Sequence, residues 1–192
     1  MHRIEKLIVN SRLHSRSVAR HAERMLQFVP LREGMRYLDA GCGNGAAAIY
    51  LAGRLPLEVT GIDADPEQIR AARAAAQALN QARFLVADAT RLPFGTGEFD
   101  IVATNKTTHH IPNWEHAFEE MARVLKPGGH LIYCDFVVPE WIAAAGKRLC
   151  SRLGWPARGT LNCLVTQTGL VALHCRRRLV NFDAVWRKGR SA

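Results

Sequence analysis

A glycine-rich stretch, residues 37–45 (YLDAGCGNG), is the part of this sequence best suited to hold a ligand. Glycines between a strand and a helix let the backbone approach a ligand closely and direct free N–H groups at an anion. The spacing alone does not choose the ligand, because Gly41, Gly43 and Ala46 also fit a dinucleotide-binding loop.

A carboxylate just before this loop limits which ligand the loop can bind. Asp39 lies two residues before the first glycine. A negative charge there would oppose a pyrophosphate, whereas it would suit the ammonium and sulfonium groups of S-adenosylmethionine (SAM). The alternative is an aspartate that only hydrogen-bonds its own turn. The loop therefore favours SAM over a nicotinamide dinucleotide.

Two further aspartates follow apolar runs at points where a nucleoside could be recognised. Asp63 comes roughly 20 residues after the loop, where an acidic residue can accept hydrogen bonds from a ribose diol. Asp65 competes for this role, but it precedes Pro66 and is better explained as a helix cap. Asp88 follows the next apolar run and could accept from an adenine amino group, or else close a turn.

A polar segment with Asn105, His109 and His110 follows the fourth apolar run. Open α/β sheets place their ligand crevice at this end of their strands. Since an imidazole titrates near neutral pH, His109 and His110 are the candidates for a general base, with packing or cofactor contact as the alternative. Adjacent histidines need further ligands to hold a metal, so no metal site is expected.

The elements that position these residues alternate between short β-type runs and helical runs. Strands are predicted at residues 36–39, 57–62, 84–86, 99–103 and 130–138, and helices at 17–29, 46–54, 66–79, 113–125, 141–153 and 160–168. Two last strands, 171–180 and 182–187, are joined too tightly for a helical crossover and should pair antiparallel. The alternation predicts an α/β fold with a mostly parallel sheet and helices on both faces.

Five motifs in order resemble those of class I SAM-dependent methyltransferases, especially the branch that includes ubiquinone/menaquinone-biosynthesis and other small-molecule or lipid methyltransferases. They are YLDAGCGNG, VTGIDADPEQI, VADATRLPFGTGEFDIV, HHIPNW and RVLKPGGHLIY, within about residues 36–136. The resemblance implies a Rossmann-like three-layer sandwich, whose seven-stranded, mostly parallel sheet has one antiparallel strand at its C-terminal end. It also implies an enzyme that uses SAM as cofactor and releases S-adenosyl-L-homocysteine.

The resemblance assigns the methionyl part of SAM to the first and fourth strands. Asp39, Gly41 and Gly43 would hold this part of the cofactor, and Asn105 would line its end beneath the reactive methyl group.

The adenosine part is assigned to the second and third strands in the same way. Asp63 would bind the ribose hydroxyls, with Ala64 alongside the adenine, and Asp88 and Ala89 would meet the adenine edge.

Charge is distributed unevenly along the chain. Residues 1–36 hold eight Lys/Arg and three Asp/Glu, residues 37–139 eight and twelve, and residues 140–192 ten and two. We expect a basic helical segment, residues 1–35, packed on a single methyltransferase domain, residues 36–192. Basic ends suit anionic partners, so a peripheral contact of the N-terminal helix with an anionic membrane is left open beside the alternative of solvated surface charge.

Composition predicts an intracellular, cytoplasmic protein. No apolar run reaches bilayer length, and the basic N-terminus lacks a signal-peptide core. Five dispersed cysteines without a CxxC pair (Cys42, Cys134, Cys150, Cys163 and Cys175) indicate reduced thiols rather than a zinc site.

The expected acceptor is a small or lipid-like molecule, and three other functions stay open. A SAM-binding protein without transfer activity would carry the same cofactor residues. An NAD(P)-dependent oxidoreductase would leave Asp39 and Asp88 without a role. A nucleic-acid methyltransferase is disfavoured, because residues 104–107 (TNKT) replace the N/D-P-P-Y/F tetrad of base-modifying enzymes. Residues 139–168 are short where this branch often carries an insertion, so the lid is small or comes from another subunit, as in a homodimer.

Overall fold

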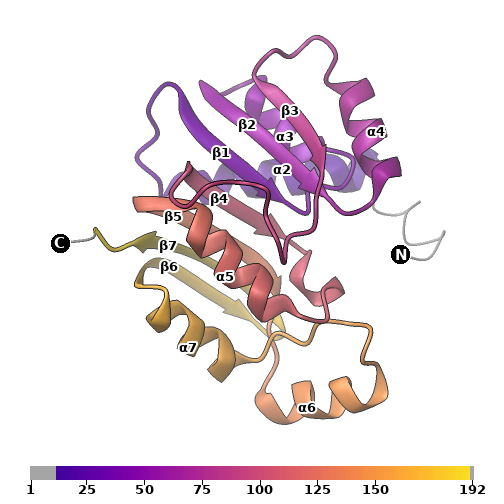
Figure 1. The fold of residues 1–192 in the computed structure, drawn as a ribbon, viewed down its shortest axis with the longest axis vertical. Helices are drawn as coiled ribbons and strands as arrows, with labels where there is room; N and C mark the ends of the chain where they lie inside the picture. The colour runs from indigo at the N-terminus through magenta and orange to yellow at the C-terminus, as the bar shows by residue number, and fades with distance from the viewer. Residues whose placement is uncertain (1–11, 191–192) are drawn as a thin grey trace.

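Seven strands form one sheet in the computed structural model, which describes residues 12–190 (Figure 1). The strands are β1 (Met35–Ala40), β2 (Leu57–Asp63), β3 (Ala82–Val86), β4 (Phe99–Asn105), β5 (Leu125–Phe136), β6 (Leu170–Arg178) and β7 (Asn181–Lys188). Their order across the sheet is β3-β2-β1-β4-β5-β7-β6.

Strands β1 to β5 are parallel, and β7 is antiparallel to both of its neighbours, β5 and β6. The expected α/β fold with one antiparallel strand at the C-terminal end is therefore confirmed. Only Leu179 and Val180 separate β6 from β7, and Leu179 has a φ of 49°, so the chain reverses at once and the two strands must pair antiparallel. The last strand of the chain thus lies inside the sheet, and β6 forms its edge.

Helices cover both faces of the sheet (Figure 1). One face carries α2 (Arg12–Leu26), α3 (Ala46–Ala52) and α4 (Pro66–Ala75), and the other carries α5 (Trp114–Val124) and α7 (Arg158–Gln167). In β1, Tyr37 packs into the first of these cores and Leu38 into the second, as expected for a strand buried on both sides. Helix α6 (Glu140–Leu149) lies away from the sheet.

The basic N-terminal helix α2 packs on the core rather than standing apart. Ala19, Met25 and Leu26 are buried, and Met25 and Leu26 join the cluster that contains residues of α3. The division of the chain at residue 35 stays a prediction. Within residues 12–190, no helix is both long and apolar enough to cross a bilayer.

Several predicted boundaries were wrong. The helix expected to reach Leu79 ends at Ala75, since the N–H of Ala76 already closes the last turn onto the carbonyls of Ala72 and Arg73. The strand predicted to begin at His130 begins at Leu125, because Leu125 pairs with Phe99 of β4 and the Lys-Pro-Gly-Gly segment continues the strand.

The predicted helix cap at Asp65 is confirmed, whereas the residue that precedes α5 makes no such cap. Asp65 caps α4 as expected, because its Oδ1 accepts from the N–H of Glu67 at 2.9 Å. Asn113 precedes α5 but its side chain makes no capping hydrogen bond. Its amide lies 2.8 Å from Nδ1 of His116 instead.

Candidate functional site

A cavity of about 880 Å³ opens where β1, β2 and β4 end. The structure brings together on its wall all eight residues expected to contact a cofactor: Asp39, Gly41, Gly43, Asp63, Ala64, Asp88, Ala89 and Asn105. His109 and His110 line the same cavity. The carboxyl ends of parallel strands thus converge here, as in other open α/β sheets.

The glycine loop is fastened to the end of β2. The backbone N–H groups of Gly41 and Cys42 both donate to the carbonyl of Ile62 at 2.8 Å. Gly41 has a φ of 83°, and a Cβ atom added there would overlap the side chain of Thr107. Both the backbone conformation and the close approach require glycine at this position.

Asp39 presents a buried carboxyl group at the end of β1. Asp39 is only 5% exposed. Burial, and then the negative charge of Asp63, raise the pKa of Asp39 to about 7. A cation that entered the cavity would favour ionisation of this carboxyl group.

Asp63 organises the loop while facing the same cavity. Its Oδ2 accepts from the N–H of Gly43 and its Oδ1 from the N–H of Asp65, both at 2.9 Å. A carboxylate oxygen can accept more than one hydrogen bond, so both oxygens keep acceptor capacity for a diol.

Asp88 fits both of its interpretations. Its Oδ1 accepts from the N–H and the hydroxyl of Thr90, each at 2.8 Å, which is the hydrogen-bonding pattern of a turn. Asp88 is nevertheless exposed on the cavity wall, next to the buried Ala89. Turn formation by Oδ1 does not prevent Oδ2 from accepting from a ligand.

Two other polar side chains on the wall were not expected to face a ligand. Within residues 12–190, Gln68 Oε1 and Thr104 Oγ1 are buried without a hydrogen-bond partner. Gln68 is recognisable from sequence only as the third residue of its helix. Leaving such atoms unpaired is costly, so polar groups of a ligand would stabilise them. With Asp39 for an ammonium group and Asp63 for a diol, the residues present fit SAM.

Comparison with known proteins identifies the family. A model of the methyltransferase domain matches residues 38–133, half of the chain. The chain belongs to this methyltransferase domain family. It is 38% identical over 139 residues to the 27-O-demethylrifamycin SV methyltransferase of Amycolatopsis mediterranei. The matched region is 69% of this chain and 51% of that protein. The chain is 37% identical over 114 residues to the fatty-acid O-methyltransferase of Mycolicibacterium smegmatis, with 57% and 41% covered.

The fold of this methyltransferase domain also occurs in solved structures. Phosphoethanolamine N-methyltransferase 2 of Haemonchus contortus, in complex with SAM, matches with a TM-score of 0.67 at 22% identity, covering 79% of this chain and 37% of that one. The chain spans about half the length of the curated relatives it matches. The expected SAM-dependent methyltransferase domain is confirmed by family membership, which also removes the support for the nicotinamide alternative.

The methyltransferase domain holds a buried carboxylate that sequence reasoning missed. Asp135 is fully buried in β5, and its Oδ1 lies 2.6 Å from Nδ1 of His109. Its Oδ2 accepts from the N–H groups of Thr107 and Thr108 and from the Thr108 hydroxyl, at 3.0, 2.7 and 2.7 Å. Burial acts to raise the pKa of Asp135. The hydrogen bond from His109, the positive charge of that ring when it is protonated, and the hydrogen bond from Thr108 outweigh burial and lower the pKa. The carboxylate is therefore held ionised beside His109.

A signal for Asp135 exists in the sequence. It is the single charged residue in the apolar run of residues 131–138 (LIYCDFVV), and a charge in a buried strand needs a partner. His109 supplies that partner from the 3-10 helix η1 (Thr108–His110), whereas the His110 ring lies 3.9 Å from the His109 ring between centroids. The pairing distinguishes the two histidines, which the sequence treats alike.

Proposed function

We propose that this chain transfers a methyl group from SAM to a hydroxyl group of a small or lipid-like acceptor and leaves S-adenosyl-L-homocysteine. The observation that carries the proposal is the His109–Asp135 pair on the wall of the cavity that the cofactor residues line. When bound, SAM supplies a methyl group activated by a positively charged sulfur. A hydroxyl acceptor loses its proton as it attacks, and so it needs a base at this place.

The base in this proposal is His109. Its Nδ1–H donates to Asp135, which fixes the tautomer and leaves Nε2 to accept the proton of the acceptor. The negative charge of Asp135 then stabilises the imidazolium that forms. The His109 side chain is 21% exposed, so the ring can reach a molecule in the cavity while Asp135 stays out of water.

The residues at the strand ends orient the cofactor. Asp39 and the Gly41–Gly43 loop hold its methionyl part, and Asp63 holds the ribose. The remaining contacts, with the adenine and beneath the methyl group, are assigned to Ala64, Asp88, Ala89 and Asn105. Holding donor and acceptor within about 3–3.5 Å of each other supplies much of the rate acceleration in such a displacement.

The acceptor class is supported by the apolar side chains that line the rest of the cavity. Val18, Ala22 and Met25 contribute from α2, and Ile111 and Leu153 from the segments that follow η1 and α6. The relatives described above are named for methyl transfer to a demethylrifamycin and to a fatty acid. An apolar molecule with one hydroxyl group fits such a wall.

Contact with an anionic membrane is a further part of the proposal, and it is electrostatic only. Arg16, Arg20 and Arg24 are exposed along α2, whereas its apolar residues Met25 and Leu26 are buried in the core. Over residues 16–26, where its side chains are described, the helix therefore offers charge to lipid headgroups without a free apolar face to insert. A cytoplasmic location and a homodimer stay predictions.

Transfer from SAM with a tritiated methyl group to a panel of hydroxylated lipids, quinols and small apolar molecules tests this function. The wild type should label at least one class, while His109→Gln binds S-adenosyl-L-homocysteine normally in calorimetry and labels none. Equal labelling by His109→Gln would contradict the role of the base. Tight nucleoside binding with no labelled product would favour a SAM-binding protein without transfer.

A further inference from the structure

Three side chains from separate elements meet at the border of the cavity. His21 comes from α2, Cys134 from β5 and Asp183 from β7. Cys134 and Asp183 are direct partners in the antiparallel pair of strands, so their side chains lie on one face of the sheet. Helix α2 packs on that face, because Met25, one turn after His21, belongs to the same buried cluster as Cys134.

The potential ligand atoms of these residues are close together. His21 Nε2 lies 3.3 Å from Asp183 Oδ1, and the Cys134 thiol is hydrogen-bonded to the Asp183 carboxylate. One ligand atom from each residue falls within 4.8 Å of the other two. Cys134 is only 2% exposed, so its sulfur is held in place by the core.

We propose that His21, Cys134 and Asp183 form a binding site for a zinc-like divalent cation. Nitrogen and oxygen ligands at about 2.0–2.2 Å from a tetrahedral zinc lie roughly 3.3–3.5 Å apart. The distance between His21 Nε2 and Asp183 Oδ1 already matches this separation of two zinc ligands. One imidazole, one thiolate and one carboxylate favour zinc over magnesium or calcium, which prefer oxygen ligands alone.

A simpler explanation covers part of the cluster. A His21–Asp183 pair could tie α2 to β7, with Cys134 as an ordinary buried residue. That explanation assigns no role to the closeness of all three potential ligand atoms, which lie within 4.8 Å of one another. A cation bound by the three residues would use Cys134 as a thiolate ligand, and its binding would release the thiol proton.

Two nearby positive charges oppose a cation. Arg24 Nη2 lies 3.4 Å from Nδ1 of His21, the ring nitrogen that would not bind the ion. The charge of Lys106 acts on both Cys134 and Asp183, but its ammonium group is hydrogen-bonded to Asn181 and lies 3.7 Å from the centroid of the Phe136 ring. With thiolate and carboxylate both ionised, the two protein anions neutralise the two charges of the ion. Lys106 therefore stays outside the site without competing for its ligands.

The fourth coordination position would face the cavity. His21 and Cys134 both line it, so an ion can enter from there and keep an open position. Three protein ligands with an open position are typical of zinc sites that bind a substrate or water. No sequence motif indicates this site, because its three ligands are far apart in the chain.

Titration of the purified, metal-free chain with Co²⁺, followed by absorption spectroscopy, tests the site. We expect one equivalent to bind with a thiolate-to-cobalt charge-transfer band, and Zn²⁺ to displace it. Cys134→Ser should abolish the band, and Asp183→Asn and His21→Asn should weaken binding at least tenfold. The control is Cys163→Ser, which changes an exposed cysteine on α7 and should leave the band intact.

A thermal melt separates loss of the site from loss of the fold. Zn²⁺ should raise the melting temperature of the wild type and of Cys163→Ser but not of Cys134→Ser, because only a bound ion stabilises the native state. No charge-transfer band in the wild type, or a band that Cys134→Ser retains, would overturn the proposal. Binding of S-adenosyl-L-homocysteine, measured in the same samples, reports on the proposed function separately.

Discussion

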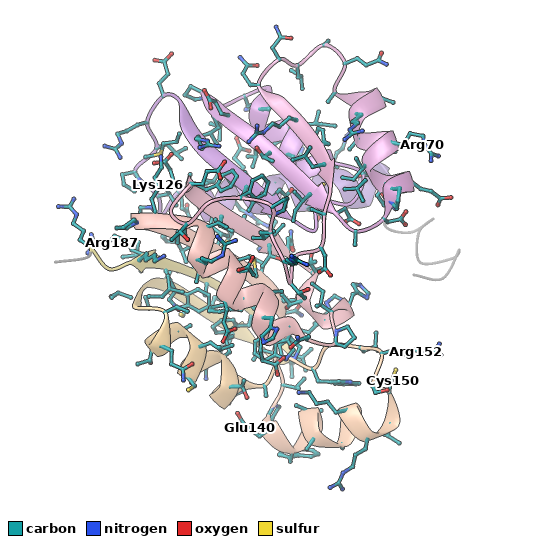
Figure 2. The ribbon with its side chains drawn as sticks, viewed as in Figure 1. Arg70, Lys126, Glu140, Cys150, Arg152 and Arg187 are labelled. Atoms are coloured by element: carbon teal, nitrogen blue, oxygen red, sulfur yellow. The ribbon has the colours of Figure 1, made fainter. Side chains whose placement is uncertain are left out.

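The two ends of the cavity differ in how firmly the surrounding structure holds their residues. At the cofactor end, Asp39 is buried in β1, and the carboxylate of Asp63 at the end of β2 is held by backbone N–H groups at 2.9 Å. At the acceptor end, the chain returns from α6 through Cys150 and Arg152 (Figure 2). Helix α6 rests on a small cluster and leaves Trp141 73% and Leu149 89% exposed. The residues that we assign to the cofactor are thus held by the sheet, whereas part of the wall that we assign to the acceptor comes from the weakly packed segment after α6.

The largest effect should come from the residue between these ends. His109→Gln removes the base while keeping a side chain of similar size, and loss of general-base catalysis should lower kcat by about 10²–10⁴-fold. Affinity for S-adenosyl-L-homocysteine, measured by calorimetry, should stay within about twofold. His110→Gln is the matched control, and we expect it to lower kcat by less than about tenfold. Equal losses in the two variants would mean that Asp135 does not distinguish the histidines.

A substitution at the cofactor end should lower the affinity for the nucleoside rather than kcat. Asp63→Ala removes two acceptors for the ribose and frees the N–H groups of Gly43 and Asp65, so binding of S-adenosyl-L-homocysteine should weaken about 100-fold, at roughly 1.5 kcal/mol for each hydrogen bond to a charged group.

Asp65→Ala is the control for Asp63→Ala. It removes the cap of α4 and should cost about 1 kcal/mol of stability, measured by chemical denaturation, with little change in affinity. If the two variants lost affinity equally, the ribose assignment would have to be abandoned.

The elevated pKa of Asp39 predicts how that affinity depends on pH. A carboxyl group with a pKa of about 7 is largely neutral at pH 5.5, whereas the ammonium group of the ligand requires it ionised. Affinity should therefore rise by about 25-fold between pH 5.5 and 7.5, following the ionised fraction. The unliganded protein should become less stable over the same pH range. The raised pKa of Asp39 contributes stability that is fully present below the ordinary pKa of this group and is lost as the pH rises through 7.

Asp39→Asn is the test of this assignment by calorimetry across the pH range. The variant cannot ionise, and its affinity should be low and independent of pH. A wild-type slope that survives in Asp39→Asn would assign the titration to another group.

Much of the cofactor end could be predicted from sequence because its signals are local. A glycine loop after a strand and an aspartate at each strand end are contiguous patterns, and parallel strands carry them to one edge of the sheet. Family membership and the sheet confirm the fold that these patterns predict.

The remaining features depend on contacts between distant segments. Asp135 and His109 are paired only because β5 lies beside β4. The early end of α4 at Ala75 contradicts the helix propensity of the alanines that follow it. Gln68 turns into the cavity for a reason that its place in the helix does not reveal.

The change with the smallest expected effect tests whether the two ends of the cavity act independently. A Cβ atom added at Gly146 of α6 would overlap the indole of Trp155. Gly146→Ala should therefore displace α6 and the segment after it, from which Cys150, Arg152 and Leu153 line the cavity. We expect the KM for the acceptor to rise by about threefold, measured by steady-state kinetics, with affinity for S-adenosyl-L-homocysteine unchanged. Trp141→Ser, on the exposed face of the same helix, should change neither value. If Gly146→Ala weakened nucleoside binding as well, α6 and the strand tips would be one coupled unit, and the contrast between the two ends would fail.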